Sequence, residues 1–421
     1  MTGNAPVYCF TIPSLHDSTV LDCRIYHPAS LQDAQIGQQR TRKAALIAHP
    51  YAPLGGCMDD PVVMTIVDQL IDLDFVVGTF NFRGAADSQG STSWAGKAER
   101  DDYISVAGHL LFYLNYLHKS DIGPAITRNS QSPAGSVDNT SSDHITLVLG
   151  GYSYGSLIVT HLPPTAEILA IFHQTQSSTT VSEILLRAKE IALQTDELMS
   201  KQMETRGRLT NQPPRRGHQR QSSSQHSIIY GGSDSPSPAD RHSMDLVHKS
   251  MEVPARIKHA MHRSHKHSTT STATSSLTSS DGSTAQSNEV MLDSSPHIFT
   301  HYLLISPLLP PISTALSFST SSLMFWRHTA SHTDNLVRNP TFLIYGTEDM
   351  FTSSHKMDTW CKKMDALSAQ AVGSSGQSSF RWKKVQGAGH FWREHGVEAQ
   401  LTESLRKWVH EEIAHDYSLH E

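Results

Sequence analysis

The chain alternates two patterns of apolar residues over positions 1–120. Nearly continuous apolar runs at 43–50 and 75–82 are typical of buried parallel strands, because helices cover both faces of such strands. Between them, residues 60–74 place apolar side chains three and four positions apart, as on one face of a helix. Strand and helix in alternation predict an α/β fold with a mostly parallel central sheet flanked by helices.

The same patterns recur along the rest of the chain, on either side of a polar loop at 121–143. Further β-type runs lie at 7–12, 20–28, 144–150, 301–309, 342–346 and 380–392. Further helices are predicted at 96–119, 181–205, 355–367 and 398–413.

From residue 207 to residue 295 both patterns stop. Ser, Thr, His, Gln and Arg dominate, and few large apolar side chains remain to offset the entropy cost of ordering the backbone. We therefore predict a single α/β domain in two parts, 1–206 and 296–421, separated by a disordered insert at 207–295. The insert is rich in Lys and Arg, so regulation by phosphorylation or an acidic partner is one hypothesis for it.

Composition excludes several classes of protein. With 34 Lys and Arg against 40 Asp and Glu, the net charge of −6 excludes a surface that is basic throughout, so we expect no nucleic-acid partner. Four scattered cysteines without a CxxC pair argue against a disulfide scaffold or a thiolate zinc site and suit a reducing compartment. We find no signal-peptide pattern at the start and no apolar run near the roughly 18 residues of a membrane span, which predicts a cytoplasmic protein.

The strongest chemical signal is the segment Gly151-Tyr152-Ser153-Tyr154-Gly155. A bare G-x-S-x-G pattern is common, but this one follows a predicted buried strand and opens an apolar helix. In that setting the sharp turn exposes the serine hydroxyl above the sheet, where the helix N-terminus stabilises negative charge. The alternative is an ordinary glycine-rich turn with a spectator serine. We favour Ser153 as a nucleophile.

A serine hydroxyl needs a base and an acid that orients the base, and in this architecture both follow the serine in the chain. Asp349 comes directly after the predicted strand at 342–346, and we choose it over its neighbour Glu348. His390 follows the last strand between glycine and aromatic residues, a setting that His355 and His395 lack.

Backbone amides are expected to bind the oxyanion of the reaction. One is the N–H of Tyr154, next to the nucleophile, and the other is the N–H of Tyr51, in the loop after the third strand. His49 precedes the serine in the chain, so we interpret it as a residue that shapes this loop.

Two loop motifs add a resemblance to a known family. The chain carries His49-Pro50, Pro53-Leu54-Gly55-Gly56 and Met58-Asp59, followed by Asn81-Phe82-Arg83-Gly84 and Ser88-Gln89-Gly90. Together with the serine turn, these motifs resemble a bacterial and fungal branch of the α/β-hydrolase superfamily that is prolyl-oligopeptidase-like. The resemblance covers roughly 43–165 and 300–410, and it departs at Ala86, where the branch has glycine. Arg83 either binds a carboxylate or holds its loop, and we favour the structural role.

These observations predict a serine hydrolase that cleaves a carboxylic ester, thioester or amide of a small acyl substrate through an acyl-serine intermediate. No cofactor and no metal are needed for this reaction. The alternatives are a peptidase of the prolyl-oligopeptidase type, or a catalytically silent fold that serves as a binding or scaffold protein.

Two further features have weaker functional interpretations. His259, His262, His265 and His267 are closely spaced in the insert, which favours adventitious metal binding over a folded site. Trp326 and Trp392 either line a substrate pocket or pack in the core.

Overall fold

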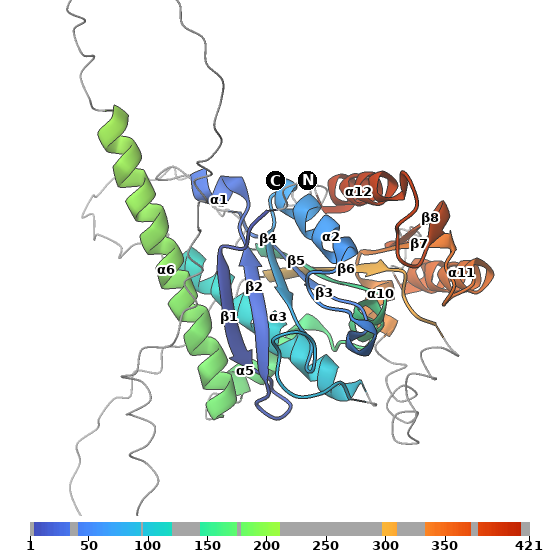
Figure 1. The fold of residues 1–421 in the computed structure, drawn as a ribbon, viewed down its shortest axis with the longest axis horizontal. Helices are drawn as coiled ribbons and strands as arrows, with labels where there is room; N and C mark the ends of the chain where they lie inside the picture. The colour runs from blue at the N-terminus through green and yellow to red at the C-terminus, as the bar shows by residue number, and fades with distance from the viewer. Residues whose placement is uncertain are drawn as a thin grey trace, which may run out of the picture. The chain divides into compact units, whose positions relative to one another are not determined.

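The computed structural model describes residues 4–33, 41–93, 96–119, 144–174, 178–210, 297–309, 333–371 and 378–413. Its centre is an eight-stranded sheet in the order β1-β2-β4-β3-β5-β6-β7-β8 (Figure 1). β2 pairs antiparallel with both β1 and β4, and every other pair is parallel. This is the strand order of the α/β-hydrolase fold, so the predicted fold class is confirmed. The strands are β1 (Tyr8–Pro13), β2 (Val20–Tyr26), β3 (Lys43–Ala48), β4 (Val76–Phe80), β5 (His144–Tyr152), β6 (His297–Ile305), β7 (Thr341–Glu348) and β8 (Phe380–Gly389).

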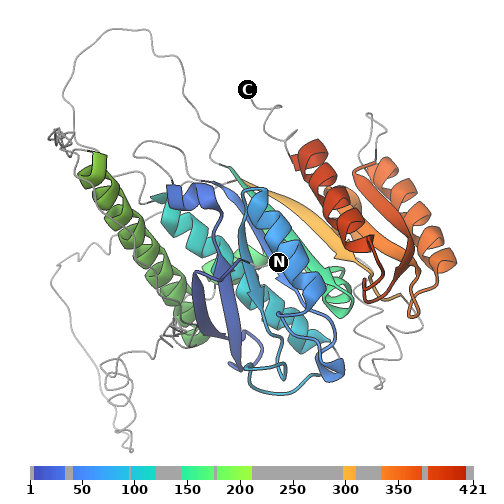
Figure 2. The same cartoon turned by 45° about the horizontal axis from the view of Figure 1, so that its top comes forward.

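Helices cover both faces of the sheet, as the continuous apolar strands require. One face carries α2 (Pro61–Asp72) and α12 (Val397–Trp408), which contact each other and lie on the near side of the sheet in Figure 2. The other face carries α3 (Lys97–Lys119), α4 (Tyr154–Val159), α5 (Thr165–Gln174) and α11 (Ser354–Ala371).

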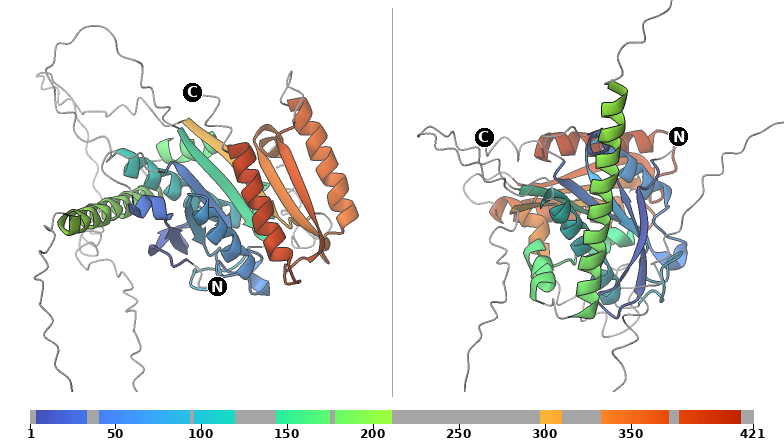
Figure 3. Two further views of the ribbon diagram at one scale, coloured as in Figure 1. Left: turned by 90° about the horizontal axis from the view of Figure 1, so that it is seen from above. Right: turned by 90° about the vertical axis from the view of Figure 1, so that its left-hand side faces the viewer.

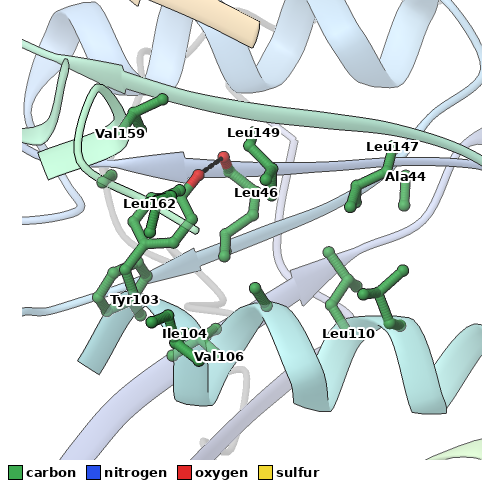
Figure 4. Close-up of a cluster of buried hydrophobic side chains, with 14 of the residues drawn as sticks. Ala44, Leu46, Tyr103, Ile104, Val106, Leu110, Leu147, Leu149, Val159 and Leu162 are labelled. Carbon is green, nitrogen blue, oxygen red and sulfur yellow. Dashed lines mark hydrogen bonds between the residues drawn. The ribbon is translucent and has the colours of Figure 1, made fainter. Parts of the chain in front are cut away.

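Side chains alternate between these two layers along each strand. On β3, Ala45 and Ile47 pack toward α2, whereas Ala44 and Leu46 pack toward α3. The Tyr103 hydroxyl of α3 donates a hydrogen bond of 2.9 Å to the carbonyl of Leu46 (Figure 4). This bond ties the helix layer to a central strand inside the apolar core.

The helix α6 (Thr179–Thr210) lies beside the edge strand β1, as Figures 1 and 3 both show. The Thr195 hydroxyl lies 3.0 Å from the Tyr8 hydroxyl, and the Arg187 guanidinium donates to the Thr11 hydroxyl at 3.0 Å. An exposed strand edge invites pairing with other chains, and a helix beside it blocks that contact.

The predicted strands and long helices are present, with small shifts in their ends. The insert predicted at 207–295 lies outside the described residues except for 207–210, which continue α6. The polar loop at 121–143 lies outside them altogether. Three short helices were not expected from the sequence: α1 (Ala29–Asp33), α5 and α10 (Thr333–Arg338). No helix within the described ranges combines the length and apolarity needed to cross a membrane.

Candidate active site

Ser153 occupies the turn between β5 and α4. Its backbone has φ 56° and ψ −110°, a conformation that is strained for a residue with a side chain. The turn is possible because glycines stand two positions before and two positions after the serine. A Cβ on Gly151 would lie 2.4 Å from the carbonyl carbon of Gly155, and a Cβ on Gly155 would lie 2.5 Å from the carbonyl oxygen of Ala48. The serine amide donates to the carbonyl of Ile305 at 2.8 Å, which fixes the turn against β6.

His390 and Asp349 lie in line with this serine. The Nε2 atom of His390 is 2.8 Å from the Ser153 hydroxyl, and its Nδ1 atom is 2.7 Å from an Asp349 carboxylate oxygen. The three residues directly follow β5, β8 and β7, whose carboxyl ends meet at one edge of the parallel sheet. All three are buried, with 4% of His390 exposed.

The Asp349 carboxylate is held in one orientation. Its other oxygen accepts hydrogen bonds from the amides of Phe351 at 2.8 Å and Thr352 at 3.0 Å. Glu348 is exposed on the surface, because adjacent residues of an extended strand point in opposite directions. His355 and His395 are also exposed.

Tyr51 and Tyr154, the residues predicted to supply oxyanion amides, lie next to each other. Their rings meet edge to face with centroids 5.1 Å apart. Tyr154 is the first residue of α4, so its N–H has no acceptor within the helix. Tyr51 precedes the short 3₁₀ helix η1 (Ala52–Leu54) and lines the cavity in front of Ser153. Oxyanion binding by these amides stays a prediction.

The two loop motifs of the sequence hold each other in place. The His49 Nδ1 donates to the Pro50 carbonyl at 2.6 Å, and its Nε2 accepts from the amide of Phe82 at 2.8 Å. The Asn81 side chain in turn accepts from the amide of Met58 at 2.9 Å. Burial lowers the pKa of His49 to about 4, which keeps the ring neutral and able to accept that bond.

Arg83 makes buried contacts with the protein itself. Its guanidinium donates to both carboxylate oxygens of Asp102, at 2.9 and 2.6 Å, and to Asp17 at 2.9 Å. Because these donors are occupied, the arrangement fits a structural role for Arg83. Ala86, which departs from the family motif, adopts φ 42°, a left-handed conformation that favours glycine.

A cavity of about 200 Å³ opens in front of Ser153 and His390. Much of its wall is apolar or aromatic, and two charged side chains, Asp60 and Arg393, also line it. The wall comprises Pro50, Tyr51, Leu54, Gly55, Gly56, Asp60, Tyr152, Ser153, Leu308, Phe351, His390, Phe391 and Arg393.

Trp392 is buried and takes no part in this cavity. Its ring N–H donates to the Ser306 hydroxyl at 3.1 Å, which favours the packing role over the pocket role considered from the sequence. Trp326 lies outside the described residues.

Tyr152 is a residue of the site that sequence reasoning missed. Its hydroxyl donates a hydrogen bond of 2.7 Å to the main-chain carbonyl of His390, and the side chain is buried. Burial raises the pKa of this phenol, so the hydroxyl keeps its proton for the bond. The signal in the sequence is its position directly before Ser153, but its partner could not be read from the chain.

We expect Tyr152→Phe to lower kcat by about five- to tenfold with little change in KM, since the variant loses the hydroxyl that positions the histidine but keeps the ring that lines the cavity. Tyr345→Phe is the matched control, because that buried strand tyrosine bonds Asp358, remote from the cavity. Steady-state kinetics on an activated ester would check this. Equal losses in both variants would contradict the positioning role.

Among the residues that the structure describes, no cluster of three or more His, Cys, Asp or Glu side chains could hold a metal ion. The histidines at 259–267 lie outside those residues.

The chain matches no family model, and a search of curated proteins gives no match. Several solved structures are similar to it. An α/β serine hydrolase without a lid, XC6422 from Xanthomonas campestris, has 13% identity and a TM-score of 0.41, covering 97% of this chain and 96% of its own. Est1E from Butyrivibrio proteoclasticus has 9% identity and a TM-score of 0.41, covering 96% and 99%. The esterase Pf2001 from Pyrococcus furiosus has 11% identity and a TM-score of 0.41, covering 96% and 91%. At such identities and TM-scores, the likeness says nothing about activity.

Proposed function

We propose that this protein is a serine hydrolase that cleaves small carboxylic esters, thioesters or amides through an acyl-serine intermediate. The observation that carries the proposal is the unbroken hydrogen-bonded line from the Ser153 hydroxyl through His390 to Asp349. This line ends at a cavity large enough for a small acyl group.

Each residue then has a defined role. Asp349 accepts a hydrogen bond from the Nδ1–H of His390, which leaves the unprotonated Nε2 free to take the proton of the Ser153 hydroxyl. The serine oxygen attacks the acyl carbon, and His390 returns the proton to the leaving group. His390 next deprotonates a water that attacks the acyl-serine and releases the acid. The Tyr51 and Tyr154 amides stabilise the oxyanion that forms in both steps.

The size and lining of the cavity favour a small-molecule ester over a peptide as substrate. A volume of about 200 Å³ accommodates a short acyl chain, and its aromatic wall suits an apolar one. The loop motifs support assignment to the bacterial and fungal branch with the HP…GG-x-M and NFRG patterns. We also propose the catalytic role over a silent scaffold, because a scaffold has no use for a strained serine bonded to a histidine.

The test is hydrolysis of short activated esters by the wild type and by Ser153→Ala. We expect the variant to lose at least about 10³-fold in kcat, since it lacks the hydroxyl that forms the acyl intermediate in this mechanism. Ser404→Ala, on α12 and away from the cavity, should retain wild-type turnover. Near-normal hydrolysis by Ser153→Ala would show that another residue is the nucleophile.

A further inference from the structure

Arg393 is the one cation among the described residues that line the cavity of Ser153. It stands three positions after His390, on the loop that follows β8. Its neighbours in the wall are mostly apolar or aromatic. Apart from the catalytic groups, the positive charge of Arg393 is therefore the feature of the cavity that would attract a polar substrate most strongly.

Within the described part of the chain, the Arg393 guanidinium makes no hydrogen bond or ion pair, although its charge interacts with Asp60 at longer range, and the side chain is exposed. Its guanidinium carbon lies 5.5 Å from the centre of the Phe391 ring. Arg83 differs, because Asp102 and Asp17 occupy its donors. The donors of Arg393 are therefore available to a ligand.

The backbone beneath Arg393 is fixed. Trp392, the preceding residue, is buried with φ 55°, and its ring N–H is bonded to Ser306. A guanidinium that projects from a fixed point loses less entropy on binding than one on a mobile loop.

Asp60 also lines the cavity, but its carboxylate is bound to the N-terminus of α2. It caps α2, and its carboxylate accepts the amide of Val62 at 2.9 Å. The positive end of the helix dipole therefore stabilises this carboxylate, and Asp60 also attracts Arg393 without a hydrogen bond or ion pair between the two among the described residues. Burial also raises the pKa of Asp60, which shows that the surroundings disfavour its ionised form.

A second, smaller cavity of about 100 Å³ shares Asp60, Tyr152, Phe391 and Arg393 with the first. Its wall includes Glu398, whose carboxylate accepts a hydrogen bond from the Thr65 hydroxyl at 3.2 Å. A bound anion would meet this like charge in the smaller cavity. The side of Arg393 that faces Ser153 is therefore the favoured place for an anion.

We propose that Arg393 binds a carboxylate carried by the substrate, and that the preferred substrates are esters bearing a free carboxylate, such as half-esters of short dicarboxylic acids. Guanidinium and carboxylate match as a planar, bidentate pair, and the charge on both groups strengthens their hydrogen bonds. This inference rests on the proposed hydrolase function and names the substrate class for it.

The experiment measures kcat/KM for matched esters in wild type and Arg393→Gln. One pair is 4-methylumbelliferyl hemisuccinate and its methyl ester, which places the carboxylate in the acyl part. The second pair is 4-acetoxybenzoate and its methyl ester, which places it in the leaving group. For each pair, the ratio is kcat/KM for the charged ester divided by kcat/KM for the neutral ester. In at least one pair, we expect this ratio to be about 10- to 100-fold lower in Arg393→Gln than in the wild type.

Two further variants sharpen the comparison. Arg393→Lys keeps the charge but not the planar fork, so it should restore part of the ratio. Arg381→Gln removes a guanidinium that bonds Glu412 far from the cavity, and it should leave the ratio at the wild-type value.

The outcomes separate this proposal from the function on which it rests. If the wild type hydrolyses the neutral esters and Arg393→Gln leaves both ratios unchanged, the carboxylate proposal is overturned and the hydrolase function stands. A wild type that rejects both charged esters while cleaving the neutral ones also overturns it. Failure to cleave any ester, together with an unreactive Ser153, removes the hydrolase function and this proposal with it.

Discussion

Replacing Asp349 by asparagine should lower kcat about 10³- to 10⁴-fold while the protein remains folded. One oxygen of Asp349 accepts the amides of Phe351 and Thr352, so the amide oxygen of an asparagine would stay there. Its NH₂ group would then face Nδ1 of His390, from which the carboxylate now accepts a hydrogen bond. The histidine would be forced into the tautomer with its proton on Nε2, which cannot take the proton of Ser153.

Glu348→Gln is the matched control for this variant. Glu348 is the neighbouring acid, but it is exposed and does not contact His390, so turnover should stay within about twofold of wild type. Kinetics on one activated ester, with thermal melting to show that both variants fold, would check both predictions. Retained activity in Asp349→Asn with loss in Glu348→Gln would mean that the acid is Glu348.

Acidification from pH 7.5 to pH 5 should destabilise the fold by several kcal/mol. Burial lowers the pKa of His27 and of His49 to about 4, and that of His109 to about 3. The unfolded chain binds a proton on each histidine near its ordinary pKa of about 6.5, whereas the folded protein does not. Their contribution to stability is therefore complete above about pH 6.5 and falls as the pH drops toward 4. At pH 5 each of these histidines lowers the free energy of unfolding by about 2 kcal/mol relative to pH 7.5.

Denaturant unfolding at the two pH values measures this loss. His109 stacks on Phe10 with centroids 4.7 Å apart, and its Nε2 atom is buried without a hydrogen-bond partner among the described residues. His109→Leu should therefore reduce the loss by about 2 kcal/mol, whereas His395→Gln, at an exposed site, should not change it. A loss that is the same in wild type and His109→Leu would show that this histidine does not drive the acid response.

The sheet was predictable because its strands are buried on both faces and therefore read as continuous apolar runs. The segments 43–50 and 75–82 became β3 and β4 with ends shifted by a few residues. The short helices α5 and α10 carry no such signal. Each has too few turns for a clear helical period, and packing against the core decides its structure.

The order of residues in the chain was enough to choose the candidate catalytic residues but not their supporting contacts. Ser153, Asp349 and His390 each follow a predicted strand, so their meeting at one sheet edge followed from topology. The bond from Tyr152 to the His390 carbonyl joins residues 238 positions apart, and no local pattern encodes it. The same holds for Arg393, because its place in the cavity depends on how Trp392 anchors the loop.

The most direct measurement is the identity of the residue that a fluorophosphonate modifies. Such a probe forms a covalent bond only with an activated serine, and the Ser153 hydroxyl lies 2.8 Å from the base that would activate it. After reaction and proteolysis, mass spectrometry should place the phosphonyl group on the peptide containing Ser153, and Ser153→Ala should remain unmodified. Modification of a different serine, or a folded wild-type protein that does not react at all, would contradict the account.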